Sequence, residues 1–212
     1  DQTDSGNGTI LVTNQLLDQY GISKEQLRAD AMENAPEIRP SEIRGISEVM
    51  NELAPGMIPE VAPEDEQMFV ATVPDKIHGA GVIAYPNFME DAAERMGGDF
   101  FVLPSSIHEV LLVKDNGQMT AKELENMVKE VNATQVEPAD QLTDHVYHYD
   151  SQNHIFELAD KYEERQREAE HEAVDKDSVL GDLKEKKQEI AKKDPAKDAV
   201  TKAAIKKHET SL

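Results

Sequence analysis

The stretch Gly97–Gly117 most strongly constrains what this chain can fold into. It contains two short apolar runs, Phe100–Leu103 and Val110–Val113, which are rich in aromatic and β-branched residues. Runs of this length and composition, bounded by turn-forming residues, are typical of buried β-strands. Pro104–Ser106 lies between them, and both proline and serine favour turns. The stretch therefore predicts a β-hairpin with a slightly long connection.

The residues before this hairpin predict a strand followed by helices. Ser23 and Gln26 have the spacing of a capping box, in which their side chains satisfy backbone N–H groups at a helix start. Ala35 and Pro36 are expected to end that helix, because a residue before proline avoids helical dihedral angles. The predicted elements are a strand at Thr9–Thr13 and helices at Asn14–Tyr20, Ser23–Asn34 and Pro40–Leu53.

A pseudo-repeat includes the hairpin. FVATVPDKIHGAGVIAYPNFMEDAAERM and FFVLPSSIHEVLLVKDNGQMTAKELENMV each have the pattern of strand, proline turn, Ile-His, strand and helix. Two such ββα units predict an α+β fold, with one antiparallel sheet and helices packed on one face. Ile77 and Ile107 would face the core and His78 and His108 the opposite face, because strand side chains alternate. The alternative is that the shared Ile-His pair is accidental. The predicted strands are Met68–Val73, Gly79–Tyr85 and His145–Tyr149, and further helices begin at Pro86 and Thr120.

The character of the chain changes towards its C-terminus. Ile155–Tyr162 is amphipathic and is expected to dock on the domain, whereas Glu163–Lys176 has almost no large apolar residue and predicts a solvated helix. Lys184–Lys207 holds nine lysines against four acidic residues. This tail is either a mobile, partly helical extension or a segment that folds on a partner. The predicted divisions are an N-terminal strand and helices (1–53), a proline- and acid-rich loop (54–67), a ββα-ββα-β core (68–159) and the charged tail (160–212).

The acidic charge of the chain lies almost entirely in its first 159 residues. The formal net charge is −21, and the residues from Asp160 onward hold 13 basic and 14 acidic residues. The first 159 residues therefore hold the other 9 basic and 29 acidic residues, a balance of −20. Such a surface repels phosphate backbones, so we expect no nucleic-acid binding by this part. The simplest interpretation is that the charge keeps the protein in solution.

Cysteine and long apolar runs are both absent from the sequence. Without cysteine there is no disulfide, thiolate ligand or cysteine nucleophile. No apolar run approaches the roughly 20 residues that span a bilayer, and no signal peptide is recognisable. We therefore expect no membrane association and a cytoplasmic location.

Several motifs recur in the order found in one known family. ILVTNQLLDQYGIS, ENAPEIRP, KIHGAGVIAY and PSSIHEV resemble a domain-of-unknown-function family of bacterial proteins, many of them encoded on mobile elements. The resemblance covers roughly Thr9 to Tyr149 and implies no established activity or catalytic residues. Family members usually carry a substantial segment before the ILVTN-like stretch, so the resemblance implies that this chain lacks an N-terminal lobe.

Residues in two loops are the candidates for catalysis. Ser105 or Ser106 as nucleophile, His108 as base and Glu109 as its orienting acid would be one arrangement, with His78 as a second histidine. A serine needs its base within hydrogen-bond reach, and the base needs its own partner. Neighbouring strand residues point to opposite faces, so Glu109 is badly placed to orient His108. The simpler interpretation is that the serines cap the turn.

The densest group of possible metal ligands lies near the predicted last strand. It consists of His145, His148, Asp150 and His154. His148 and Asp150 share a strand face while His145 points away, and this spacing matches no standard zinc or non-haem iron pattern. No phosphate-binding glycine loop or EF-hand pattern is present either. We therefore expect no metal and no cofactor.

Three hypotheses for function remain open. The first is a non-enzymatic accessory or protein-interaction protein of a bacterial mobile element, which needs a protein partner. The second is a hydrolase that uses His78 or His108 with a nearby carboxylate. The third is an acidic decoy that mimics DNA, motivated by the charge of −20 on the first 159 residues.

Overall fold

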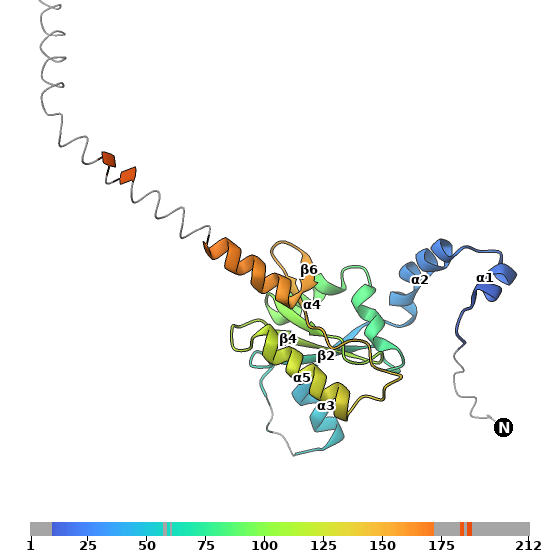
Figure 1. Ribbon diagram of the computed structural model, residues 1–212. Coiled ribbons are helices and arrows are strands. Elements are labelled where there is room, and N and C mark those ends of the chain that lie inside the picture. The colour runs from blue at the N-terminus through green and yellow to red at the C-terminus, as the bar shows by residue number, and fades with distance from the viewer. Residues whose placement is uncertain (1–9, 57–58, 60, 172–182, 185, 188–212) are drawn as a thin grey trace, which may run out of the picture. The chain divides into compact units, whose positions relative to one another are not determined.

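A single antiparallel sheet organises the part of the chain that the computed structural model describes, which is residues 10–56, 59, 61–171, 183–184 and 186–187 (Figure 1). The strands are β1 (Glu42–Gly45), β2 (Met68–Thr72), β3 (Phe100–Leu103), β4 (Val110–Lys114), β5 (Tyr147–Asp150) and β6 (Ile155–Leu158). The helices are α1 (Asn14–Tyr20), α2 (Lys24–Ile38), α3 (Ile46–Leu53), the 3₁₀ helix η1 (Gly79–Ala84), α4 (Phe88–Met96) and α5 (Ala121–Thr134), and residues 159–171 are also helical. The predicted α+β class with an antiparallel sheet is confirmed.

The predicted hairpin forms the centre of this sheet. Strand β3 pairs antiparallel with β4, with Val102 opposite Leu112. The strand order is β1-β2-β4-β3-β5-β6, so earlier strands add on the β4 side and later strands on the β3 side. The sheet therefore grows outward from one local hairpin, and β1 and β6 are its two edges.

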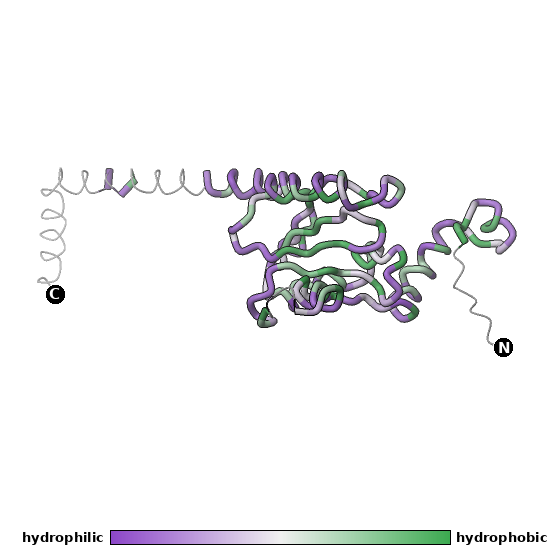
Figure 2. Tube along the Cα trace, turned by 90° about the horizontal axis from the view of Figure 1, so that it is seen from below, coloured by the Kyte–Doolittle hydropathy of each residue, from purple (hydrophilic) through white to green (hydrophobic). Residues whose placement is uncertain are grey.

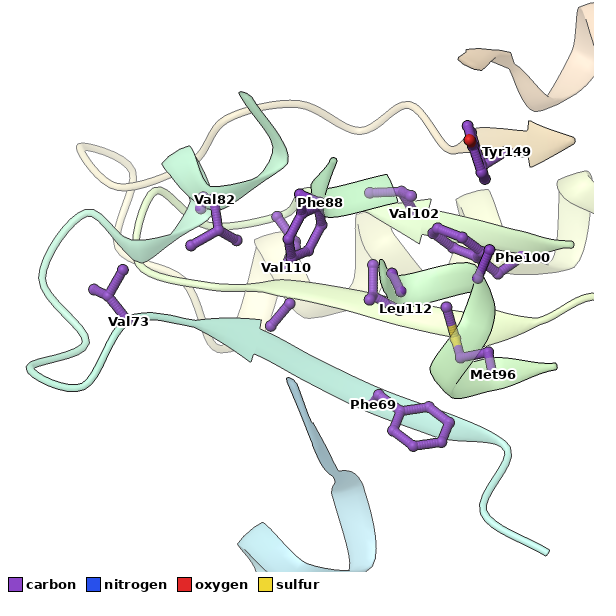
Figure 3. Close-up of a cluster of buried hydrophobic side chains, with 14 residues drawn as sticks. Phe69, Val73, Val82, Phe88, Met96, Phe100, Val102, Val110, Leu112 and Tyr149 are labelled. Carbon is purple, nitrogen blue, oxygen red and sulfur yellow. The ribbon is translucent and has the colours of Figure 1, made fainter. Parts of the chain in front are cut away.

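Both faces of the sheet are covered, which corrects the prediction that helices pack on one face. Phe100 and Val102 belong to one cluster of buried side chains, together with residues of η1 and α4 (Figure 3). Phe101 and Leu103 belong to a second cluster on the other face, together with residues of α5. The physical reason lies in the sequence, because a strand buried on both faces is a continuous apolar run without polar alternation. Figure 2 shows this concentration of hydrophobic residues along the strands.

The first of the two predicted ββα units lacks its second strand. The residues predicted as a strand at 79–85 form η1, in which Gly81 N–H donates to the His78 carbonyl at 3.3 Å and Tyr85 N–H to the Val82 carbonyl at 3.0 Å. These donors are satisfied within the turn, so no neighbouring strand is needed. Ile77 is exposed and Ile107 is only partly buried, and neither lies in a strand. The predicted equivalence of the two Ile-His pairs is therefore wrong.

The N-terminal elements also differ from the prediction. Residues 10–13 form no strand, and α2 continues through Pro36 to Ile38. Proline has a helix-compatible φ and removes one donor, so a helix can pass through it at a cost. The start of the predicted helix at Pro40–Leu53 is wrong, because Glu42–Gly45 pairs with β2 as an edge strand before α3 begins.

The amphipathic stretch that was expected to dock on the domain begins with a strand. Ile155–Leu158 is β6, which pairs with β5 so that Tyr149 lies opposite Phe156. The chain divides into two compact units, residues 1–160 and 161–212. Within the second unit residues 161–171 are helical, and the expectations for the rest of the tail lie mostly outside the described residues. None of the helices in the described ranges combines the length and the apolar character that a membrane span requires.

Candidate functional site

Three loops meet at one end of the sheet and bring the two Ile-His pairs together. They follow β2, connect β3 to β4, and connect α5 to β5. The Ile107 carbonyl accepts a hydrogen bond from Ala80 N–H at 3.1 Å, and Ile107 N–H donates to the Asp140 carbonyl at 2.8 Å. The Thr72 hydroxyl donates to the His108 carbonyl at 2.8 Å. These backbone contacts fix the positions of both histidines.

The imidazoles of His78 and His108 contact each other edge to face, with ring centroids 5.8 Å apart. The backbone N–H of His78 donates to His108 Nδ1 at 3.3 Å, and His108 Nε2 lies 3.5 Å from Asp140 Oδ2. Because Nδ1 accepts, these contacts assign the proton of neutral His108 to Nε2, where the carboxylate can accept it. His78 is exposed and has a left-handed φ of 54°. The cluster therefore joins an exposed imidazole to a His–Asp pair.

The serines of the same loop have other partners. Ser106 Oγ accepts the backbone N–H of His108 at 3.0 Å, and the carbonyl of buried Ser105 accepts Leu142 N–H at 3.0 Å. Neither serine hydroxyl is hydrogen bonded to an imidazole among the residues that the structure describes, and Glu109 is exposed. The acid beside His108 is Asp140, which sequence reasoning missed because it lies in a loop distant in sequence.

The histidines considered as metal ligands lie in different surroundings. His148 is completely buried with Nε2 3.1 Å from Asp115 Oδ2, whereas His145 is largely exposed beside Glu125. Asp150 accepts hydrogen bonds from the backbone N–H groups of Gln152 and Asn153, so it shapes the β5–β6 turn. Within the described ranges no three His, Asp or Glu residues gather closely enough to hold a metal ion.

A cavity of about 680 Å³ lies where β1 passes into α3, and no sequence motif marked it. Its lining includes Gly45, Ser47, Glu66, Phe69 and Arg95. Glu66 is 7% exposed, and its Oε2 accepts hydrogen bonds from both Ser47 N–H, at 3.2 Å, and the Ser47 hydroxyl. Gly45, the N-cap residue, has no side chain for this purpose, so Glu66 caps α3 from a distant loop.

The approach of Glu66 depends on Gly45. A Cβ at that position would lie 2.7 Å from Glu66 Oε2, closer than real Cβ contacts. On the rim, Arg44 pairs with Glu48 at 3.0 Å and also with Glu52. The hydrogen bond from Arg44 holds the pKa of Glu52 below its ordinary range, so this carboxylate stays ionised. The cavity therefore combines fixed charges with an aromatic wall.

Comparison with known proteins gives one match. The model of the family of unknown function DUF5688 matches residues 1–151. No curated protein and no solved structure matches the chain. Since the matched region covers most of the sequence, including the whole N-terminal segment, the central hairpin and β5, the chain belongs to the DUF5688 family.

Proposed function

We propose that this protein is a non-enzymatic interaction protein that acts as an accessory factor of a bacterial mobile element. The supporting observation is the exposure of residues 10–38, which contain α1 and α2. Leu17 is the one buried residue in this range, and α2 has none. A folded segment of this kind displays apolar side chains that a protein partner would cover.

The exposed apolar residues of this segment are large. Ile10, Leu11, Tyr20 and Ile38 are each more than 60% exposed. Isolated helices shorter than about 12–15 residues are marginal in water, and α1 has 7 residues. Burial against a partner would supply the stabilisation that the segment lacks by itself, at roughly 25 cal/mol per Å² of apolar surface.

The end of α2 is anchored to the domain. The guanidinium of Arg39 binds the Asp75 carboxylate and the Ile77 carbonyl, and Tyr85 OH donates to the Arg39 carbonyl at 3.0 Å. This anchor links the exposed helices to the loop that carries His78. A partner bound to α1 and α2 would thus be held beside the folded sheet.

Quantitative affinity capture from the encoding bacterium tests the proposal. The tagged chain is compared with a variant carrying Leu11→Ser, Tyr20→Ser and Ile38→Ser. A control variant carries Gln15→Ser, Arg28→Gln and Glu33→Gln, which change exposed polar residues of the same helices. A protein retained by wild type and control but lost from the first variant supports the proposal. Identical captured proteins for all three chains would refute it.

The contact between His78 and His108 favours one alternative, a hydrolase. Asp140 beside His108 supplies the carboxylate that such an enzyme needs. His78→Ala and His108→Ala, each compared with the exposed control His145→Ala, would be assayed on ester and phosphoester substrates. An activity lost in the first two variants and kept in the third would favour the enzyme.

A further inference from the structure

The cavity beside α3 contains two groups of opposite charge with unused hydrogen-bonding capacity. Glu66 Oε2 is occupied by Ser47, but Oε1 accepts no hydrogen bond from any residue that the structure describes. Arg95 lies over the Phe69 ring, 6.0 Å from its centroid, and forms no ion pair or hydrogen bond within the described ranges. The two residues line one cavity without pairing with each other.

The other two carboxylates of the lining are already paired. Glu48 and Glu52 share Arg44, which approaches from β1. Glu66 is fixed because Ser47 holds one oxygen and Gly45 leaves room for it. A carboxylate that is nine-tenths buried and held in one orientation is prepared to meet a cation without reorganising. Glu66 and Arg95 are therefore the charges that a ligand would use.

The lining also includes apolar side chains. Phe69 of β2 contributes its ring, at the border of the cluster in Figure 3, and Val61 and Pro63 come from the loop before β2. The volume of about 680 Å³ is in the range of small-molecule sites, which combine apolar walls with a few placed polar groups. An arginine with free donors is suited to a carboxylate, which it can bind through two parallel hydrogen bonds.

We propose that this cavity binds a small zwitterion with an apolar body, the chemistry of a free apolar amino acid. The ligand's ammonium group donates to Glu66 Oε1, its carboxylate accepts from Arg95, and its side chain lies against Phe69. The bound ligand neutralises both unused charges, which a simple cation or a simple anion cannot do. This site is separate from α1 and α2, so it does not depend on the proposed partner.

Calorimetric titration of the full chain with leucine tests the inference, because leucine has two matched analogues. 4-Methylpentanoate lacks its ammonium group, and 3-methylbutylamine lacks its carboxylate. We expect saturable binding of leucine, with each analogue weaker by about tenfold or more, the equivalent of one lost charged contact. Methionine and phenylalanine serve as further probes of the apolar wall.

Two variants identify the site. Glu66→Gln keeps an acceptor for Ser47 and removes the charge, and Arg95→Gln removes the guanidinium. Each should weaken leucine binding by about tenfold or more. Glu66→Gln should leave the weak binding of 4-methylpentanoate unchanged, and Arg95→Gln that of 3-methylbutylamine. Glu94→Gln, an exposed neighbour on α4, is the control. Thermal melts confirm that each variant is folded.

Three results would overturn the inference. The first is that leucine, methionine and phenylalanine all fail to bind at millimolar concentrations. The second is that 3-methylbutylamine, which lacks the carboxylate, binds as tightly as leucine, which identifies a plain cation site. The third is that leucine binds equally to wild type, Glu66→Gln and Arg95→Gln, which places it elsewhere.

Discussion

His148 and Asp115 form a hydrogen-bonded pair inside the domain, with His148 Nε2 3.1 Å from Asp115 Oδ2 and the imidazole completely shielded from water. The same imidazole contacts Phe101 edge to face, with ring centroids 5.0 Å apart. The pair connects β5 to the residue that follows β4, across the hairpin at the centre of the sheet. A polar side chain in this position stabilises the fold only while its partner is present.

His148→Ala should therefore lower the free energy of unfolding by about 2–4 kcal/mol, through a cavity and the loss of the hydrogen bond between the imidazole and Asp115 Oδ2. Urea denaturation at neutral pH measures this change in the free energy of unfolding. His145→Ala is the matched control, since this side chain is 65% exposed, and should change stability by less than about 0.5 kcal/mol. Equal effects of the two substitutions would contradict the structural role of His148.

Substitution by alanine should destabilise the protein at Gly79 but not at Gly81. A Cβ on Gly79 would collide with the Thr72 hydroxyl and the His108 carbonyl, whereas a Cβ on Gly81 meets nothing within 4 Å. Gly79→Ala should cost about 2–3 kcal/mol, as overpacking does. Gly81→Ala should remain within about 0.5 kcal/mol of wild type. Thermal melts of the two variants measure these changes in stability. A tolerated Gly79→Ala would show that the loops around Gly79 leave room for a methyl group.

The start of α5 depends on a capping box. Thr120 Oγ1 accepts the Glu123 backbone N–H at 3.3 Å, and Glu123 Oε2 accepts Thr120 N–H at 2.9 Å. Thr120→Ala should cost about 1 kcal/mol, and Thr120→Ser less than about 0.5 kcal/mol because its hydroxyl remains. Chemical denaturation compares them. Equal losses would mean that the methyl group of Thr120, and not its oxygen, supplies the stability.

Glu125 should make stability depend on pH. The hydrogen bond from Lys122, at 3.1 Å, and the nearby Lys129 hold the pKa of Glu125 below its ordinary value of 4.5. A lowered folded-state pKa means that this contribution is complete above the unfolded-state pKa and is lost as pH falls through the folded-state value.

Glu125→Gln should then be about 0.5–1 kcal/mol less stable than wild type near pH 7. The difference should shrink at an acidic pH below the lowered folded-state pKa, where the wild-type carboxylate is protonated in both states. Urea titrations at both pH values measure the difference, with exposed Glu130→Gln as control. A deficit of equal size at both pH values would assign the effect to packing.

The elements that the sequence predicted well are those that local patterns determine. Phe100–Leu103 and Val110–Val113 are continuous apolar runs, and Thr120 with Glu123 is a complete capping box. Residues 79–84 were mistaken for a strand because their apolar composition suits a strand, while hydrogen bonds within the turn, and one from Ala80 N–H to the Ile107 carbonyl, hold them as η1. The same runs also contain the signal for a sheet covered on both faces, since neither alternates with polar residues.

The candidate sites were harder to predict than the fold. The sequence singled out His78 and His108, but their meeting follows from loop packing and not from the proposed repeat. Asp140 and Glu66 act from loops distant in sequence, and spacing rules cannot detect such partners. Whether the acidic surface mimics DNA stays a prediction.

The order of strands in the sheet has a consequence for how the chain folds. Two strand pairs of the described sheet, β3–β4 and β5–β6, are joined by short loops, whereas Phe100 meets Tyr149 and Met68 meets Val113 after large loops close. Of these two hairpins, β3–β4 lies at the centre of the sheet and is the more deeply buried. We expect this hairpin to belong to the folding nucleus. Val102→Ala should then mainly slow refolding, and Ile155→Ala in β6 mainly accelerate unfolding, as stopped-flow kinetics would reveal. The outer strands of the sheet, β1 and β2 on one side and β5 and β6 on the other, would therefore open first from the native state.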